Sequence, residues 1–416
     1  MKKILWVCSA PLPDVQKLVK IKSYNEGWLI GISNQLRKRD DIIFYYAFPQ
    51  SSSTKVIKKS INGINFLGFY NNHKNAYKVE DENIKVLRSI INGVNPDLIH
   101  VFGTELPHEL ECIYSIPKKE RNKVVVSVQG LTTEIAKVYT SGIPVKNRVF
   151  GKFNNNKYCC ILSDNYEFYR RGMNEKKILQ NVSNVIGRTE WDRKCVMSIN
   201  QRCHYYHCNE TLRDTFYEGS WNIENIQRYS IFVSQAYYPI KGLHILISAL
   251  PYIKNRYSNV MVFVAGKKEF LSNAYGCYIK KMMKKMDLEN DIKFVGYLSD
   301  EEMKRWLLKS HIMLMPSMIE NSPNSIGEAM LLGTPVVASN VGGIPSILDN
   351  GTDGYLYSSM DKIDLAKKVC KIFASDRVAL RISENGKKAA RFLYNKENNI
   401  EQLIRIYKEI TKNSKI

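Results

Sequence analysis

Short hydrophobic runs alternate with longer polar or amphipathic stretches along the first half of the chain. A run of this length is typical of a strand that is buried on both faces of a parallel sheet. Such runs occur at residues 3–8, 42–47, 98–101, 124–128 and 184–187. The segments between them are long enough to hold the helices that connect parallel strands. The pattern therefore predicts an α/β fold.

A second alternation of the same kind follows. Strands are predicted at 229–233, 260–265, 292–295, 312–315 and 335–338, and helices at 242–250, 278–286, 300–310 and 326–332. Ser299 and Glu302 form a capping-box pattern at the start of one of these helices. Residues 210–228, between the two series, show only weak periodicity. We therefore predict two Rossmann-like domains, at 1–219 and 220–395, with the linker near this stretch.

The last part of the chain is predicted to be helical. Its final segment carries an apolar stripe at helical spacing, made of Ile400, Leu403, Ile404, Tyr407 and Ile410. Periodicity shows that this face is buried but does not show what covers it. The segment 396–416 therefore packs either on its own domain or on the first one.

The most informative stretch runs from residue 317 to 341. Two carboxylates, Glu320 and Glu328, stand on either side of a predicted turn from a strand into a helix, and Asn324 and Ser325 begin that helix. A helix N-terminus offers unpaired backbone N–H groups to a phosphate. A carboxylate accepts hydrogen bonds from two vicinal hydroxyls. This arrangement suits a phosphorylated, polyhydroxylated ligand.

The same stretch, from Glu320 through Glu328 to the Gly-Gly-Ile-Pro at 342–345, closely resembles the nucleotide-sugar site of retaining family 4 glycosyltransferases. The resemblance implies a GT-B architecture, in which two Rossmann-like domains face each other across a cleft and the C-terminal helix crosses back to the first domain. It also implies that Glu320 contacts the donor sugar and Glu328 the ribose hydroxyls. It does not identify the sugar or the nucleotide, which could be UDP, GDP or another.

Further donor-site positions follow from the resemblance. Lys241 stands before Gly242 at a helix start, where the family supplies a lysine to the donor diphosphate. The family's arginine falls on Gln235, which can donate a hydrogen bond but brings no charge. Gly27 lies where the family carries a glycine-rich loop, although a plain helix start explains it equally well.

The acceptor side is less well marked. Many relatives place a histidine at the position of Gln129, and its absence means that Gln129 could position substrate without acting as a base. Glu105 follows a strand and is an acceptor candidate, whereas His100 within that strand is expected to be a core histidine. Arg188 could supply the cation that Gln235 does not.

The chain has 416 residues, with 61 Lys and Arg against 40 Asp and Glu, and a net charge of +21. This balance favours an anionic partner such as a nucleotide diphosphate or a membrane face. Nucleic acid is not expected, because no nucleic-acid-binding motif accompanies the charge. The first apolar run is too short for a signal peptide, and no run is long enough to span a membrane, so we expect a cytoplasmic protein.

The nine scattered cysteines fit a reducing compartment. Cys203, His204, His207 and Cys208 are potential zinc ligands within six residues. Strand alternation would send them to opposite faces, so we expect a strand and no metal.

Residues 141–195 carry eleven Lys and Arg against five Asp and Glu, interleaved with Tyr158, Tyr166, Phe168, Tyr169 and Trp191. Such a mixture suits contact with an anionic bilayer and a lipid-linked glycan acceptor. The aromatic residues could equally be core and the lysines simply solvated.

The favoured hypothesis is a retaining glycosyltransferase that moves a sugar from a nucleotide diphosphate sugar to an acceptor hydroxyl in surface polysaccharide or glycan assembly. No Asp-x-Asp sequence is present, so we expect Lys241 and the helix dipole to replace a metal ion and no cofactor to be needed. Two alternatives stay open: a nucleotide-sugar epimerase of the same fold, and a silent binder of sugar nucleotides or polyanions.

Overall fold

The computed structural model describes residues 1–16, 18–19, 27–71, 76–154, 157–266 and 271–413. The chain folds into two compact units. The first unit contains Met1–Thr133, Glu167–Thr211 and Asn395–Ile416, and the second contains Glu134–Tyr166 and Leu212–Tyr394.

The first unit is built on an eight-stranded sheet with the strand order β10-β9-β6-β5-β1-β2-β4-β3. Every neighbouring pair is parallel except β3 with β4. Its strands are β1 (Lys2–Val7), β2 (Ile42–Gln50), β3 (Ile57–Ile61), β4 (Ile64–Tyr70), β5 (Leu98–Phe102), β6 (Val124–Ser127), β9 (Asn184–Gly187) and β10 (His204–His207). Its helices are α1 (Pro13–Gln16), α2 (Gly27–Leu36), α3 (Asp81–Val94), α4 (Pro107–Ser115), most of α7 (Ile161–Gln180), α8 (Glu190–Ile199) and α15 (Lys396–Asn413).

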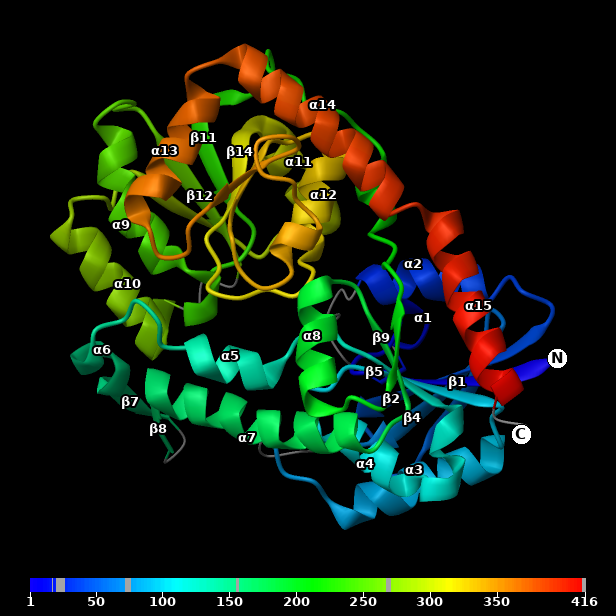
Figure 1. Ribbon diagram of the computed structural model, residues 1–416. Coiled ribbons are helices and arrows are strands. Elements are labelled where there is room, and N and C mark those ends of the chain that lie inside the picture. Colours follow the sequence, from blue (N-terminus) through cyan, green and yellow to red (C-terminus); the bar gives the residue numbers. More distant parts are fainter. Residues whose placement is uncertain (17, 20–26, 72–75, 155–156, 267–270, 414–416) are drawn as a thin grey trace. The chain divides into compact units, whose positions relative to one another are not determined.

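Side chains of β1 explain why this sheet carries helices on both faces. Ile4 and Trp6 point into one apolar cluster, with residues of α2 and α15, whereas Leu5 and Val7 point into another, with residues of α3 and α4. Alternate residues of a strand face opposite sides, so a continuous apolar run needs cover on both. Figure 1 shows α2 and α15 on one side of the sheet and α3 and α4 on the other.

The last helix, α15, belongs to the first unit, as the resemblance implied. Ile400, Leu403, Ile404 and Tyr407 all lie in the same apolar cluster as Trp6. The Trp6 indole donates a hydrogen bond to the Tyr407 hydroxyl at 2.9 Å. The apolar stripe of the final segment is therefore buried against the first sheet.

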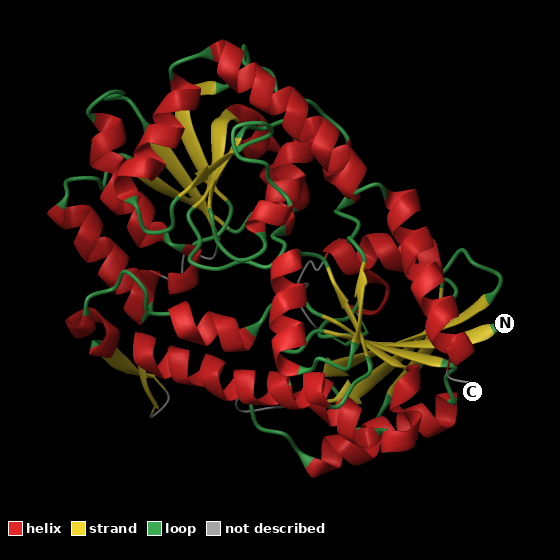
Figure 2. Ribbon diagram, in the orientation of Figure 1, coloured by secondary structure: helices red, strands yellow, loops and turns green. Residues whose placement is uncertain are grey.

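The second unit is built on a six-stranded parallel sheet with the order β13-β12-β11-β14-β15-β16. Its strands are β11 (Gln227–Val233), β12 (Met261–Ala265), β13 (Ile292–Gly296), β14 (Ser310–Met315), β15 (Val336–Ser339) and β16 (Tyr355–Tyr357). Its helices include α9 (Leu243–Lys254), α10 (Ala274–Lys285), α11 (Asp300–Lys309), α12 (Asn324–Leu332), α13 (Lys362–Phe373) and α14 (Asp376–Leu393). Figure 2 shows these strands flanked by helices. The prediction of two Rossmann-like parallel sheets is confirmed.

The unit boundaries in the structure differ from 1–219 and 220–395. The second unit begins at Leu212, and it also includes Glu134–Tyr166, with α6 (Val145–Val149) and the hairpin of β7 (Gly151–Asn154) and β8 (Lys157–Cys160). His244 of α9 is hydrogen-bonded to the Ser141 carbonyl at 3.0 Å, and Lys281 Nζ of α10 lies 4.2 Å from the centre of the Phe150 ring. These contacts join residues that are distant in sequence, which periodicity does not reveal.

Within the segment 203–208, the edge strand β10 is formed by His204–His207, both of which are exposed, and the flanking Cys203 and Cys208 are buried. In the part of the chain that the structure describes, no group of three or more His, Cys, Asp or Glu side chains is arranged to hold a metal ion. Among the described helices, none combines the length and the apolar character that crossing a bilayer requires.

Candidate functional site

The candidate site lies where the strand order of the second sheet reverses. The chain runs from β11 outward to β12 and β13 and then returns to β14 on the other side of β11. In open parallel sheets, ligands bind beyond the carboxyl ends of the two strands at such a switch point. Here these ends lead into Ser234–Lys241 and Pro316–Glu320, and the topology thus brings two distant loops together.

The two residues predicted to carry the chemistry meet at this point. Lys241 ends the short helix η3 (Pro239–Lys241), and its Nζ donates to Glu320 Oε1 at 2.7 Å. The Ser317 hydroxyl donates to the same oxygen at 2.7 Å. The two charged side chains are 20% and 11% exposed, so their ion pair is partly shielded from water.

Backbone contacts hold these loops close together. The Met318 N–H donates to the Ile240 carbonyl at 2.7 Å, which ties the loop after β14 to η3. Gly342 approaches the other side of the loop with a φ of 53°, and a Cβ there would lie 2.0 Å from the Glu320 carbonyl oxygen. Only glycine fits such an approach. Glu320 is therefore positioned by packed backbone as well as by its side-chain partners.

The N-terminus of α12 follows Glu320 closely in the sequence. Pro323 occupies the N-cap position and makes no side-chain hydrogen bond to cap the helix. Asn324 and Ser325 begin the first turn and are half-buried, and Asn324 Oδ1 has no hydrogen-bond partner among the described residues. The first N–H groups of a helix need partners, and a phosphate supplies them. The N-terminus of this helix is therefore a candidate site for an anion.

Glu328, one turn further along α12, is almost entirely buried at 3% exposed. Arg213 holds both of its oxygens, with Nε to Oε1 at 2.7 Å and a terminal nitrogen to Oε2 at 2.7 Å. The remaining terminal nitrogen of Arg213 pairs with Asp300 at the start of α11. Burial raises the pKa of Glu328, and the Arg213 guanidinium acts in the opposite direction.

Sequence analysis did not identify Arg213. It lies within the 210–228 stretch of weak periodicity and is 115 positions from Glu328, so no spacing pattern links the two. A single arginine in a segment with weak periodicity gives no local sequence signal for a binding site.

The two remaining residues predicted for the donor site, Gln235 and Gly27, lie in different units. Gln235 is exposed just beyond the end of β11, in the same connection as Lys241. Gly27 is the first residue of α2 in the first unit, which agrees with a helix start. Asn25 and Glu26, which precede it, lie outside the described residues.

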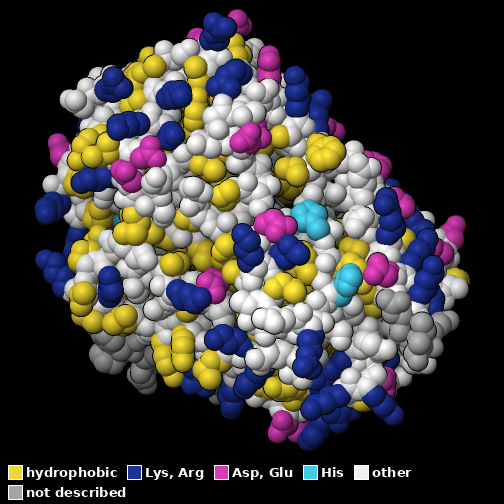
Figure 3. Space-filling view, in the orientation of Figure 1, with side chains coloured by type: hydrophobic (Ala, Val, Ile, Leu, Met, Phe, Trp, Pro, Cys, Tyr) yellow, Lys and Arg dark blue, Asp and Glu magenta, His cyan; other side chains and the backbone are white. Residues whose placement is uncertain are grey.

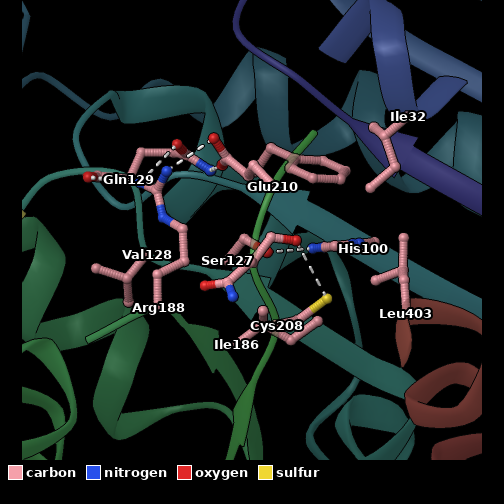
Figure 4. A pocket seen from close by; sticks show the side chains of 12 residues that line it. Ile32, His100, Ser127, Val128, Gln129, Ile186, Arg188, Cys208, Glu210 and Leu403 are labelled. Carbon is pink, nitrogen blue, oxygen red and sulfur yellow. Dashed lines mark hydrogen bonds and ion pairs between the residues drawn. The ribbon is translucent and has the colours of Figure 1, made fainter. Parts of the chain in front are cut away.

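In the first unit, Gln129 and Arg188 meet at one end of a small pocket, together with a residue that sequence analysis missed, Glu210 (Figure 4). Arg188 donates to Glu210 Oε2 at 2.7 Å, and Gln129 Nε2 donates to Glu210 Oε1 at 2.9 Å. Arg188 also lies 3.3 Å from Gln129 Oε1. The positive charge of Arg188 is thus balanced by Glu210 within the first unit.

The rest of this pocket is mostly apolar, with Phe102, Val128 and Ile186 among its lining residues. His100 lies on its floor, 2.6 Å from the Ser127 hydroxyl and 2.5 Å from the Tyr407 hydroxyl. Burial lowers the pKa of His100 well below its usual value, which favours the neutral ring. His100 is a core histidine, as predicted.

Glu105 does not line this pocket. It forms an ion pair with Arg171 of α7 at 3.0 Å, and Arg171 also donates to the Glu105 backbone carbonyl at 2.7 Å. The first unit therefore brings Gln129 and Arg188 together and directs Glu105 to a different partner.

The second unit matches a known protein family. Residues 215–389 match the family described as Glycosyl transferases group 1. Spore coat protein SA from Bacillus subtilis is 24% identical over 173 residues, which cover 41% of this chain and 46% of that protein. The chain thus spans about half the length of this curated relative.

Solved structures show the same fold over nearly the whole chain. Sucrose-phosphate synthase from Thermosynechococcus elongatus superposes with a TM-score of 0.72 at 14% identity, covering 99% of this chain and 100% of that one. The Anabaena protein HepE, solved in complex with UDP-glucose, gives 0.67 at 16% identity and covers 98% and 100%. The GT-B architecture implied by the resemblance is confirmed.

Proposed function

We propose that this chain is a retaining glycosyltransferase that transfers a sugar from a nucleotide diphosphate sugar to an acceptor hydroxyl. The match of residues 215–389 to the Glycosyl transferases group 1 family and the GT-B fold support this proposal. The observation that carries this proposal is the Lys241–Glu320 pair at the switch point of the second sheet. The open N-terminus of α12 and the carboxylate of Glu328 complete a site for a sugar nucleotide.

Each part of the site has a defined task in this reaction. The diphosphate binds the first N–H groups of α12 and the ammonium of Lys241, which exchanges its contact with Glu320 for one with phosphate. Glu320 then accepts hydrogen bonds from hydroxyls of the donor sugar, and Glu328 accepts those of the ribose. The bound nucleotide sugar of the Anabaena structure supports this choice of donor class.

The transfer step needs no general base from the protein. The bond from the sugar's anomeric carbon to the phosphate oxygen breaks, and the acceptor oxygen bonds to the same face of that carbon. The acceptor proton passes to the departing diphosphate. Lys241 and the dipole of α12 stabilise the negative charge that grows on the diphosphate, which is the task a metal ion performs in other enzymes.

A panel of UDP- and GDP-sugars tests the class of activity. A transferase releases nucleoside diphosphate when an acceptor is present, an epimerase interconverts the sugars, and a silent binder does neither. The silent binder is motivated by Gln235 and Gln129, which stand where the resemblance to family 4 glycosyltransferases implies an arginine and a histidine. Interconversion of sugars or binding without turnover would each overturn the proposed activity.

Replacing Glu320 or Glu328 by glutamine is expected to lower transfer at least about tenfold, because each change removes a charge-assisted hydrogen bond to the donor, and tenfold corresponds to about 1.4 kcal/mol. Steady-state kinetics with the preferred donor measures the loss. Glu301→Gln, at an exposed position of α11, is the matched control and should behave as wild type. Normal kinetics in both site variants would show that the donor binds elsewhere.

We propose that the acceptor is a lipid-linked glycan. The enzyme would then bind the cytoplasmic face of a membrane. A mixed surface in the second unit supports this. Val145, Val149 and Phe150 are 69%, 48% and 46% exposed, and Lys281 lies over the Phe150 ring. Figure 3 shows hydrophobic side chains over α6 with Lys and Arg among them.

Only part of the aromatic series in residues 141–195 contributes to such a surface. Tyr166 and Tyr169 are 52% and 58% exposed on α7. Phe168 is buried, and Trp191 packs against the core of the first unit. The side chain of Tyr158 lies outside the described residues.

Sedimentation with vesicles tests membrane contact. We expect binding to anionic vesicles that weakens as salt rises, and no binding to neutral vesicles, because a basic surface is attracted to anionic lipid. Phe150→Ser combined with Lys281→Glu should reduce binding severalfold, whereas Lys362→Glu on α13 is the control. An absence of binding at low salt would favour a soluble acceptor.

A further inference from the structure

Arg213 is held more tightly than a surface arginine would be. Its guanidinium contacts both oxygens of Glu328 and one of Asp300, and it lies 4.6 Å from the centre of the buried Phe216 ring. Its side chain is 17% exposed, and that of Glu328 is 4% exposed. Such a planar, bidentate contact fixes the orientation of a carboxylate as well as its charge.

The backbone that carries Arg213 is also anchored. The Leu212 N–H donates to the Tyr217 hydroxyl at 3.2 Å, and this hydroxyl donates to the Tyr394 carbonyl at 2.6 Å. Arg213 therefore extends toward Glu328 from a backbone segment that these hydrogen bonds hold in place. A side chain fixed at both ends is suited to hold its partner in place.

The contact leaves hydrogen-bonding capacity on Glu328 for a ligand. Each carboxylate oxygen can accept two hydrogen bonds, and Arg213 uses one on each. The remaining capacity can receive two vicinal hydroxyls. Without Arg213, by contrast, an ionised Glu328 would be a buried charge with no countercharge, a state that proteins avoid by taking up a proton.

We infer that Arg213 is a positioning residue of the donor site, which keeps Glu328 ionised and orients its carboxylate toward the ribose hydroxyls of the nucleotide. This inference rests on the proposed function, because it takes Glu328 as the ribose ligand. It adds to the donor site a residue that lies outside the motif at 320–345. The affinity for the nucleotide depends on this residue.

The experiment is calorimetric titration of the full chain with UDP and GDP between pH 6 and 9. Arg213→Met is expected to weaken nucleotide binding at least about tenfold at pH 7 and less at pH 9, because Glu328 then ionises only as the pH rises. Wild type should show little such dependence. Arg213→Lys, which keeps the charge but loses the bidentate contact, should fall between the two.

Arg228→Met is the matched control, because Arg228 makes a similar contact with Asp376 at an exposed site of the same unit. Tighter nucleotide binding in Arg213→Met would show that Arg213 obstructs the site and would overturn the inference. Nucleotide affinity and a pH profile unchanged from wild type, in Arg213→Met or in Arg213→Lys, would also overturn it. Glu328→Gln separates the two proposals: if it leaves binding unchanged, the donor role of Glu328 fails.

A second measurement needs no nucleotide. With Arg213→Met, the pKa of buried Glu328 should rise further above its value in the unfolded chain, so the free energy of unfolding should fall as pH increases toward that raised pKa. Thermal unfolding of wild type should lack this fall between pH 6 and 9. If the variant does not fold, Arg213→Lys is measured in the same way, and a profile identical to wild type overturns the inference.

Discussion

Replacing Lys241 by alanine is expected to lower kcat/KM for transfer by at least about a hundredfold, the usual cost of removing one group that stabilises charge in a transition state. The ammonium of Lys241 lies 2.7 Å from Glu320 at the switch point. It is therefore close to the loop where the leaving diphosphate is proposed to bind. The loss should appear in both donor affinity and turnover, because the cation contacts the diphosphate before and during its departure.

Steady-state kinetics and calorimetric titration with nucleoside diphosphate measure these two effects separately. Lys254→Ala is the matched control, because Lys254 forms a 2.6 Å ion pair with Asp291 in the same unit, away from the switch-point loops. Unchanged donor affinity in Lys241→Ala would mean that the diphosphate lies elsewhere.

Gly342→Ala should destabilise the protein and abolish transfer together. The new Cβ would lie 2.0 Å from the Glu320 carbonyl oxygen, and alanine would have to adopt a φ of 53°. The left-handed conformation costs about 1–2 kcal/mol and overpacking roughly 1–3 kcal/mol, so we expect a loss of about 2–5 kcal/mol in the free energy of unfolding. Relief of the clash would move Glu320.

Denaturant unfolding and activity are measured on the same preparation. Gly93→Ala on α3, where an added Cβ meets no atom within 4 Å, is the control and should be neutral or slightly stabilising. Wild-type activity in Gly342→Ala would show that the position of Glu320 is unimportant for transfer.

The strands were the easiest elements to predict. The runs at 98–101, 184–187 and 312–315 became β5, β9 and β14 within one or two residues, because strands buried on both faces leave a clear apolar signal. The capping box of Ser299 and Glu302 forms as expected at the start of α11. The hairpin of β3 and β4 was missed, although its turn at Asn62 and Gly63, with φ values of 49° and 79°, is a known hairpin signal.

Less of the site could be predicted from periodicity. The meeting of Lys241 with Glu320 depends on the order of strands in the sheet, which a resemblance to a family supplies and an apolar pattern does not. Arg213 and Glu210 both lie in the weakly periodic stretch, and each finds its partner only through tertiary packing. The roles of Glu320, Glu328 and Gln129 stay predictions.

The return of α15 to the first unit has a consequence for how the protein is made. The ribosome synthesises the strands of the first sheet before those of the second, yet Ile404, Tyr407 and Ile410, which help to cover one face of the first sheet, follow the whole second sheet in the chain. Until then the apolar face around Trp6 is covered by α2 but not by α15, while the strands of the second sheet have already been synthesised. The first unit can therefore complete its core only after the second sheet has been synthesised, and the apolar surface that α15 covers is exposed to aggregation until then.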